Sequence, residues 1–312
     1  SAAILFPIAM SVAEQSKGRK DHAQLGKLLL LAVAWGPAFG GVGTPIATGA
    51  NLIALNYLEE LGGITITFLD WMKIGVPIAL TLLGAGWLLL SSQVRDNGEL
   101  ELDTQIPPWT RREWLLLFYF LLAILLWVWG GGWGISSHHV ALLIAVLLFL
   151  PGLEVLEWKT ALKSVSWDSI ILICVGVVIG ELLYQYGVAE WIALKFFSKS
   201  LLSGGPFLTA LYIVLATSVL KVLFSSNTVS GIIMTPIMIS LAASLGMGAW
   251  GLVAPCIFST ALSLLVITSS PVNVVAYAGG YFTPVDLLKN GIPMTLLTGV
   301  IIAGWLTVFG VG

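Results

Sequence analysis

The sequence predicts an all-α polytopic membrane protein that contains an internal inverted repeat. Of its 312 residues, 58% are hydrophobic and only 10% are charged, whereas soluble domains carry about 25% charged residues. The apolar residues form long runs, and a few runs are interrupted by Gly, Pro and small polar residues. Most of the surface is therefore expected to face lipid, in the cell (inner) membrane.

The chain divides into segments according to these runs, because a membrane-spanning helix needs about 20 apolar residues. A run with a polar interruption is predicted to be a re-entrant hairpin or a broken helix. The predicted segments of the N-terminal part are 1–16 (second arm of a first hairpin), 27–58 (broken helix), 68–92 (transmembrane helix) and 93–112 (cytoplasmic linker). Those of the C-terminal part are 113–187 (transmembrane helices), 188–205 (interfacial segment), 206–245 (second hairpin), 249–279 (broken helix) and 283–311 (last transmembrane helix).

The second hairpin is predicted by a polar triplet, Ser226-Asn227-Thr228, between two apolar arms. Bent backbone within a membrane is tolerated where protein or a watery cavity surrounds it. With this hairpin in place, most Lys and Arg residues fall on one face of the membrane, including those of the 93–112 linker. The positive-inside rule makes that face cytoplasmic.

The two broken helices are predicted from GVGTPIATGAN at 41–51 and ITSSPVN at 267–273. Gly and Pro inside an apolar run break a membrane helix and expose its backbone groups. Ala47-Thr48 and Ser269-Ser270 are therefore expected to face the hairpin tips and to line a site.

These elements recur along the chain in the same order. Five helices are predicted between the first hairpin arm and the second hairpin, so the two copies are inverted, an architecture of secondary transporters. In each copy an Asp precedes a Lys by three residues. This spacing predicts that the Asp lies in the first turn of a helix and the Lys one turn later, as a structural pair. The matched positions are Ser1 and Ser230, Pro7 and Pro236, Ser11 and Ser240, Asn51 and Asn273, Asp70 and Asp286, Lys73 and Lys289, Gly75 and Gly291, and Pro77 and Pro293.

The repeat also predicts that a first polar triplet precedes Ser1, so that the chain begins within a longer protein.

The triplet Ser226-Asn227-Thr228 has a chemistry that suits an anion. The N-terminus of a half-helix carries free N–H groups and a partial positive charge. Ser226 and Thr228 add hydroxyl donors, and Asn227 adds an amide. Carbonyls freed around Val222 are suited to a small cation.

These motifs resemble the divalent anion:sodium symporter family, the INDY-like proteins of solute carrier family 13. The resemblance rests on the triplet, on GTPIATGAN, on SSPVN followed by VVAY, and on SWDSIIL near 166–172. It implies an elevator-type secondary transporter, in which a scaffold that includes 113–187 forms a homodimer and a mobile transport domain holds the hairpins and broken helices. It also implies a small anion such as succinate, malate, citrate or sulfate as substrate, Na+ as coupling ion for symport, and no organic cofactor.

The resemblance implies roles for individual residues. The candidate substrate-binding residues are Ser226, Asn227, Thr228, Thr48, Ser270 and Pro271. The candidate sodium ligands, partly through backbone carbonyls, are Val222, Ser226, Asn227 and Ser269 for one ion, with Ala47 at the other. The family often has Thr where Val222 stands and Gly where Ala47 stands, which leaves the substrate and the sodium coupling open.

Lys221 is a further departure, five residues before the triplet. An ammonium within the membrane is costly unless it reaches the interface, is paired or faces a cavity. We hypothesise that it balances the charge of the substrate and replaces a sodium ion. The alternative is that it points to an aqueous protein surface.

Two other functions remain as alternatives: a sodium-independent anion exchanger and a related inverted-repeat ion antiporter. The antiporter would need a carboxylate in the broken helices, where the sequence has none. The sequence contains no nucleophile–base arrangement, nucleotide motif or basic tract, so neither an enzyme nor a nucleic-acid partner is predicted. Cys174 and Cys256 are interpreted as packing residues, and the adjacent His138 and His139 as a loop-to-helix boundary.

Overall fold

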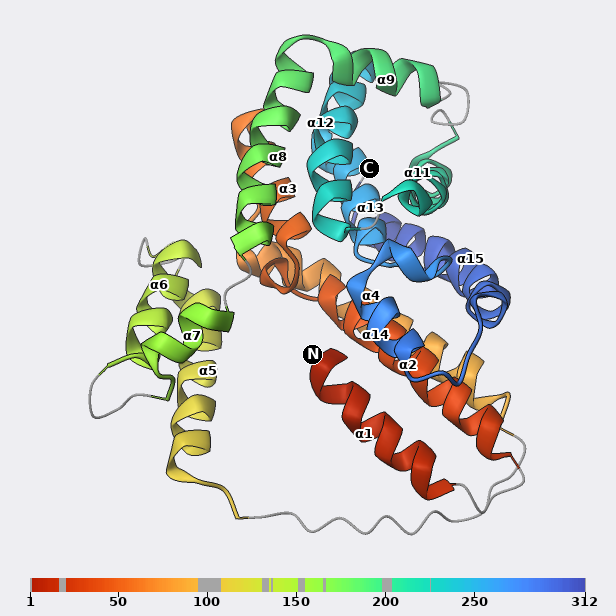
Figure 1. The fold of residues 1–312 in the computed structure, drawn as a ribbon. Coiled ribbons are helices and arrows are strands. Elements are labelled where there is room, and N and C mark those ends of the chain that lie inside the picture. The colour runs from red at the N-terminus through yellow and green to blue at the C-terminus, as the bar shows by residue number, and fades with distance from the viewer. Residues whose placement is uncertain are drawn as a thin grey trace. The chain divides into compact units, whose positions relative to one another are not determined.

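The computed structural model describes residues 2–16, 21–94, 108–130, 135, 137–150, 155–164, 167–197, 204–224 and 226–311. These residues form helices and contain no strand (Figure 1). Ser1, Ser225 and most of the predicted linker 93–112 lie outside them. Within the described ranges, six helices are long and apolar enough to cross a membrane. They are α2 (His22–Val42), α4 (Phe68–Ser91), α5 (Arg111–Trp129), α11 (Pro206–Leu220) with the turn after it, α12 (Asn227–Leu245) and α15 (Pro284–Val308).

The other helices of the described residues are not among these six. They are α1 (Ala2–Gln15), α3 (Gly49–Glu60), α6 (Ser137–Leu148), α7 (Trp158–Ser164), α8 (Trp167–Gln185), α9 (Val188–Phe196), α13 (Ala249–Thr260) and α14 (Pro271–Ala278). Three 3-10 turns accompany the breaks: η2 (Pro45–Ala47), η4 (Lys221–Leu223) and η5 (Ile267–Ser269). The helices form two compact units. One comprises Ser1–Ile66, Trp71–Leu102 and Leu172–Gly312, and the other comprises Thr67–Asp70 and Asp103–Ile171.

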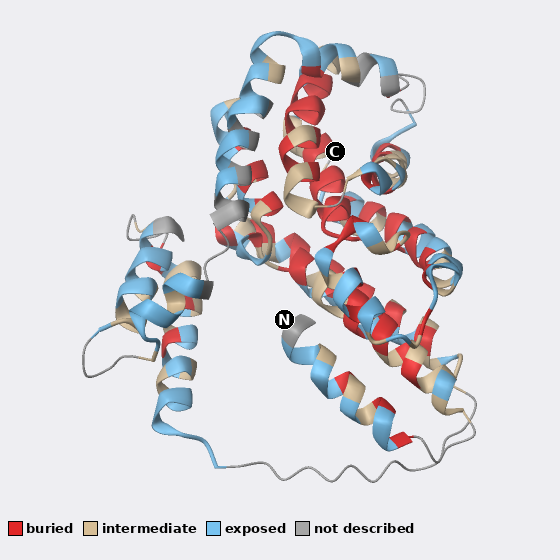
Figure 2. Ribbon diagram, in the orientation of Figure 1, coloured by how far each residue is buried: buried red, intermediate tan, exposed pale blue. Residues whose placement is uncertain are grey.

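The smaller unit contains α5, α6 and α7. α5 begins with a capping box, in which the Thr110 N–H donates to Glu113 Oε2 (2.5 Å) and the Glu113 N–H donates to Thr110 Oγ1 (3.4 Å). Such reciprocal bonds satisfy N–H groups that have no partner in the first turn. α5 and α6 are largely exposed along their length (Figure 2). Their apolar side chains are therefore available to lipid or to another protein.

The larger unit has its core at α12 and α13, which are the most continuously buried helices in it (Figure 2). Trp71 of α4 is fully buried against this core. Its indole N–H donates to the Val42 carbonyl (3.0 Å), and its ring packs edge-on against Phe258 of α13, with centroids 4.9 Å apart. A buried indole needs such a partner for its N–H. These contacts join α2, α4 and α13.

Three helix contacts of one predicted copy have a counterpart in this unit when the two copies are exchanged. α1 packs against α2 of its own copy and α14 of the other, and α12 packs against α13 of its own copy and α3 of the other. Likewise, α2 contacts α14 and α13 contacts α3. Each copy therefore completes its core with helices of the other copy.

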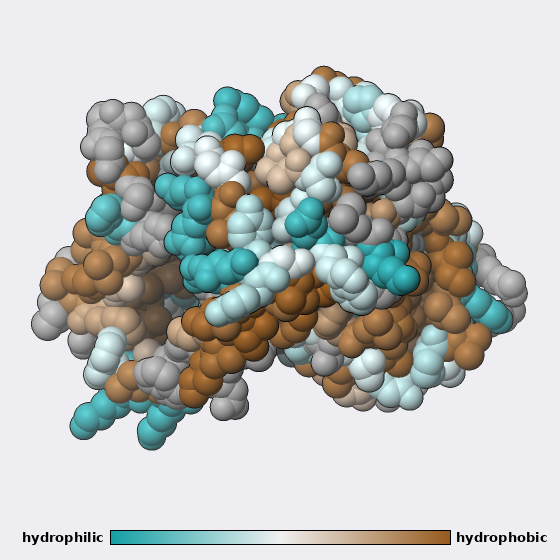
Figure 3. All heavy atoms as spheres, turned by 90° about the horizontal axis from the view of Figure 1, so that it is seen from above, coloured by the Kyte–Doolittle hydropathy of each residue, from teal (hydrophilic) through white to brown (hydrophobic). Residues whose placement is uncertain are grey.

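Large apolar side chains remain on the surface of the long helices. Trp87 and Leu88 of α4 are more than 60% exposed, and so is Leu80. Figure 3 shows one face of the molecule, seen from above. Hydrophobic side chains cover broad areas of this face, and hydrophilic ones gather in clusters. Exposed apolar areas of this extent fit a surface that is solvated by lipid.

Candidate functional site

The second broken helix unwinds where its sequence disfavours a continuous helix. α13 ends at Thr260, and the backbone is extended at Val266 (φ −132°, ψ 140°) and Ser270 (φ −155°, ψ 138°), on either side of η5. Pro271, the first residue of α14, has no N–H and moves the residue before it out of the α region. The Ser270 hydroxyl then accepts a hydrogen bond from the Val272 N–H (3.3 Å) and caps α14.

The first broken helix has the same form. Thr44 and Thr48 have extended backbones on either side of η2. Thr48 caps α3, because its hydroxyl accepts a hydrogen bond from the Asn51 N–H (3.3 Å). Both breaks thus consist of an extended residue, one 3-10 turn, a second extended residue and a new helix.

A buried asparagine holds each break open. The Asn273 amide donates to the carbonyls of Ser263 (2.7 Å) and Val266 (3.1 Å), ten and seven residues before it. Asn51 donates to carbonyls at the same spacings, at 3.3 and 3.1 Å. Both side chains are 1% exposed, and the Oδ1 of each has no hydrogen-bond partner among the described residues. The asparagine thereby replaces the helical hydrogen bonds that the unwound carbonyls lack.

The predicted hairpin tip lies between α11 and α12. After η4, Phe224 is extended, and α12 begins at Asn227 with Ser226 as its extended N-cap residue (φ −142°, ψ 134°). Ser226, Asn227 and Thr228 are all half-buried. The start of α12 is therefore sheltered by protein while its polar groups remain accessible.

Asn227 links the tip to the second broken helix. Its Nδ2 donates to the Ala261 carbonyl (3.2 Å), and its Oδ1 accepts a hydrogen bond from the Ser263 hydroxyl (3.1 Å). The same hydroxyl lies 3.2 Å from the Ser269 carbonyl oxygen. The structure thus brings together Asn227 and Ser269, two of the residues predicted for the site.

The start of α3 lies close to the start of α12. A Cβ placed on Gly231, in the first turns of α12, would lie only 2.8 Å from the Cβ of Ala50, the second residue of α3. Glycine permits this approach because it has no side chain. The capped N-terminus of α3, with Thr48, therefore lies beside the helix that carries the triplet.

Lys221 is buried, with a side chain 2% exposed. Its Nζ donates a hydrogen bond to the Thr260 carbonyl, at the end of α13. A small cavity of about 10 Å³ adjoins it, and Val222 and Ser269 are among the lining residues. The alternative that Lys221 points to an aqueous surface is therefore wrong.

The other predicted site residues lie at the edges of the breaks. Ala47 of η2 is exposed, Pro271 is exposed and Val222 is 40% exposed, whereas Ser270 is buried.

Sequence reasoning missed Ser263, which holds both Asn227 and Ser269 in place. It also missed the carbonyls of Thr260 and Ala261, which accept hydrogen bonds from Lys221 and Asn227. A backbone carbonyl has no signature in sequence, so the one signal for these three residues was that they lie in the ten residues before ITSSPVN.

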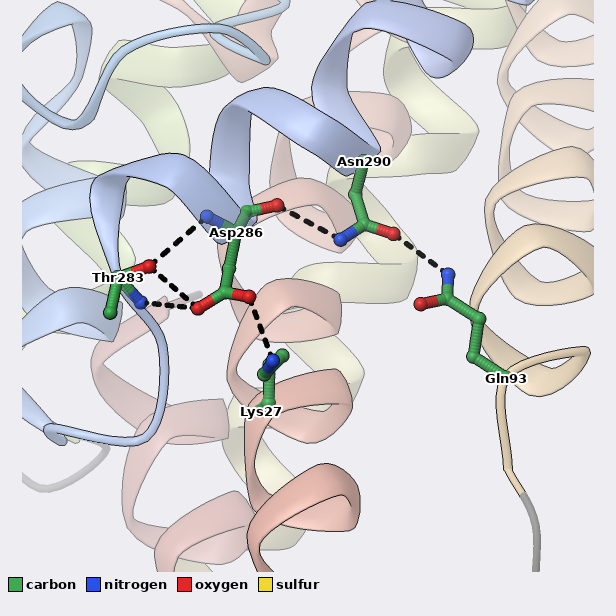
Figure 4. A network of polar contacts seen from close by, with 5 residues as sticks. All are labelled: Lys27, Gln93, Thr283, Asp286 and Asn290. Carbon is green, nitrogen blue, oxygen red and sulfur yellow. Dashed lines mark hydrogen bonds and ion pairs between the residues drawn. The ribbon is translucent and has the colours of Figure 1, made fainter.

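A second polar network lies at the N-terminal end of α15 (Figure 4). Asp286 accepts a hydrogen bond from the Lys27 ammonium of α2 (2.7 Å) and also caps α15 through Thr283. The Asn290 Oδ1 accepts a hydrogen bond from the Gln93 side chain (2.7 Å). The predicted place of Asp286 at a helix start is confirmed. Its ion-pair partner, which the sequence did not predict, is Lys27, a cation from the other copy that packing brings near.

The chain is similar to known membrane transporters. The family described as "Sodium:sulfate symporter transmembrane region" matches residues 1–311. An uncharacterized transporter of Haemophilus influenzae is 26% identical over 322 residues, which cover 97% of this chain and 67% of that protein. The sodium-dependent dicarboxylate transporter SdcS of Staphylococcus aureus is 22% identical, over 96% of this chain and 63% of its own length.

A mammalian relative is the Na(+)/citrate cotransporter of Rattus norvegicus, which is 24% identical over 91% of this chain and 60% of its own length. The chain thus spans between 60% and 67% of the length of these three relatives.

Proposed function

The chain belongs to the sodium:sulfate symporter family, and from this premise we propose that it forms the anion-binding part of a secondary active transporter. The proposed substrates are small anions with carboxylate or sulfate groups, such as succinate, malate, citrate or sulfate. The proposed coupling ion is sodium, transported in the same direction. The names of two relatives support both proposals, since one is a sodium-dependent dicarboxylate transporter and the other a sodium/citrate cotransporter.

The observation that carries the proposal is the meeting of polar helix starts inside an apolar unit. The N-terminus of α12 is joined to the second break through Asn227, and the N-terminus of α3 lies against α12 at Gly231. Helix N-termini favour anions through free N–H groups and the helix dipole. We place the anion at this junction, in contact with Ser226, Asn227 and Thr228, and next to Thr48, Ser270 and Pro271.

Sodium requires oxygen ligands at the same breaks. In the first break we place it beside the Ala47 carbonyl and the Thr48 hydroxyl. The second break offers Ser226, Asn227 and Ser269, with Val222 contributing only its carbonyl. Lys221 lies among these residues, and this one observation favours the alternative of sodium-independent exchange.

The proposed mechanism is an elevator movement in a homodimer. The transport domain would contain the hairpins and broken helices, and the scaffold would include α5, α6 and the neighbouring helices of 113–187. The exposed apolar side chains of α5, among them Trp114, Phe118 and Phe120, provide surface for lipid and for a second copy of the chain.

Uptake into proteoliposomes tests the proposed function. The protein would be expressed from its complete reading frame, and uptake of labelled succinate, citrate and sulfate would be measured with an inward sodium gradient and with choline. At least one anion should accumulate faster with sodium. Asn227→Ala should lower that uptake at least about tenfold, since hydrogen bonds to charged groups contribute about 1.5–3 kcal/mol.

The matched control is Asn56→Ala, because Asn56 is exposed on α3 and its amide lies near Glu60 (3.5 Å). This variant should transport like the wild type. Absence of uptake of all three anions by folded wild-type protein, or equal uptake by Asn227→Ala, would contradict the proposal.

A further inference from the structure

The junction of η4, α13 and η5 holds a buried lysine side chain of the chain itself. Lys221 is 2% exposed, and its ammonium donates to the Thr260 carbonyl. Carbonyls at the end of a helix have no intrahelical donor and carry the negative end of the helix dipole. The end of α13 is therefore a position that favours a positive charge, and the Lys221 Nζ lies against it.

The ammonium has little compensation from protein groups. Among the described residues, the Thr260 carbonyl is the polar partner that the structure provides for Lys221. An ammonium has three donors, and a buried charge is stabilised only when it is well hydrogen-bonded or paired. Lys221 can therefore carry its charge at this position when an anion binds nearby and compensates it.

The adjoining cavity has room for about one small guest. Its volume of about 10 Å³ is close to the minimum that holds one water molecule. It is lined by Val222 and Ser269, which are two of the four residues proposed for a sodium ion, and also by Ser218 and Thr295. A sodium ion bound here would lie beside the ammonium and be repelled by it.

We propose that the Lys221 ammonium acts as a tethered cation in the second break, in the place of a sodium ion. The inference rests on the proposed anion transport and adds that the second break contributes to anion binding without a sodium ion of its own. Sodium would then act only at the first break, near Ala47 and Thr48. With one sodium site in each protomer, and protomers that bind independently, anion binding should respond to sodium with a Hill coefficient near 1, because this coefficient cannot exceed the number of coupled sites.

Removal of the ammonium should create a new requirement for sodium. Lys221→Met keeps the length and the apolar stem of the side chain but removes the charge. We expect this variant to lose at least about tenfold in succinate affinity in choline, and to recover much of the loss at high sodium. Lys221→Arg keeps a positive charge and should retain most of the sodium-free affinity. Lys289→Met, at an exposed position of α15, should behave like the wild type.

Two measurements on purified protein from the complete reading frame test the inference. Binding of succinate, with citrate and sulfate in parallel, would be measured calorimetrically over a sodium titration at constant ionic strength. Counterflow in proteoliposomes would give the sodium dependence of transport. A Hill coefficient for sodium near 1 in the wild type, and a higher one in Lys221→Met, are the expected results.

Two results would overturn the inference alone: a wild type that transports with a sodium Hill coefficient clearly above 1, or a Lys221→Met protein with unchanged binding in choline. A wild-type coefficient clearly above 1 overturns the inference even if Lys221→Met does not fold. A folded wild type that binds and transports none of the three anions would instead refute the proposed function, and this inference with it.

Discussion

At the scale of single residues, the asparagines of the breaks are as informative as the triplet. Asn51 and Asn273 each donate to carbonyls ten and seven residues before them. Unwound backbone inside a membrane protein must find such partners, because lipid supplies none. These amides are therefore expected to stabilise the fold of the breaks, whatever anion binds nearby.

Asn273→Leu should destabilise the protein substantially. The substitution leaves the Ser263 carbonyl without its buried donor, and one unsatisfied buried group costs about 1–3 kcal/mol. The Val266 carbonyl still accepts hydrogen bonds from Ser269. We expect a loss of at least about 2 kcal/mol, measured by denaturation in detergent. Asn51→Leu should cost a similar amount, whereas Asn56→Leu, at an exposed position, should cost little. Equal stability of all three variants would contradict a structural role of the buried amides.

The sequence predicted the residue types of the site better than their contacts. The triplet and the two breaks were recognisable because polar and helix-breaking residues are rare in apolar runs. The direction of Lys221 could not be predicted, since both burial and exposure are compatible with its position in the chain. The partner of Asp286 was also hidden, because Lys27 is 259 residues away in sequence.

At the scale of elements, the long helices pass the breaks at very short distance. A Cβ on Gly291 of α15 would lie 2.0 Å from the Leu264 carbonyl oxygen, and one on Gly75 of α4 would lie 2.6 Å from that of Val42. These two glycines are matched positions in the repeat. Each therefore allows a long helix of its copy to pack directly on unwound backbone.

Gly291→Ala should strongly destabilise this packing. The added methyl group would meet backbone rather than a flexible side chain, and overpacking of a core typically costs about 1–3 kcal/mol. We expect a loss near 3 kcal/mol in detergent denaturation, together with reduced expression. Gly304→Ala is the matched control, because a Cβ there has nothing within 4 Å and Ala favours a helix. A Gly291→Ala protein as stable as Gly304→Ala would show that α15 can move away from the break.

The boundaries of the elements were predicted less well than their existence. α2 begins at His22, before the predicted start at residue 27. The apolar run could not reveal this turn, because Lys27 looks like the end of a membrane segment until its ion pair with Asp286 is known. Helix start signals were clearer: Thr283 and Asp286 form the capping box of α15, near the predicted residue 283.

At the scale of the whole molecule, the family match confirms the predicted resemblance to sodium-coupled anion transporters. The six long apolar helices among the described residues agree with the prediction of a polytopic membrane protein. Composition alone was sufficient for this level, because lipid demands apolar helices of a fixed length. The inversion of the two copies is a prediction of a different kind, since it depends on how many times the chain crosses the bilayer.

The inversion can be tested at a matched pair of exposed lysines, Lys73 of α4 and Lys289 of α15. If five crossings separate the copies, Lys289 lies on the cytoplasmic face and Lys73 on the opposite face. Lys73→Cys and Lys289→Cys would be made separately in a background in which Cys174 and Cys256 are replaced by serine. In right-side-out vesicles a membrane-impermeant maleimide should label only the first variant, and in inside-out vesicles only the second. Labelling of both from one side would mean parallel copies, in which the N-termini of α3 and α12 could not approach a shared anion from opposite faces.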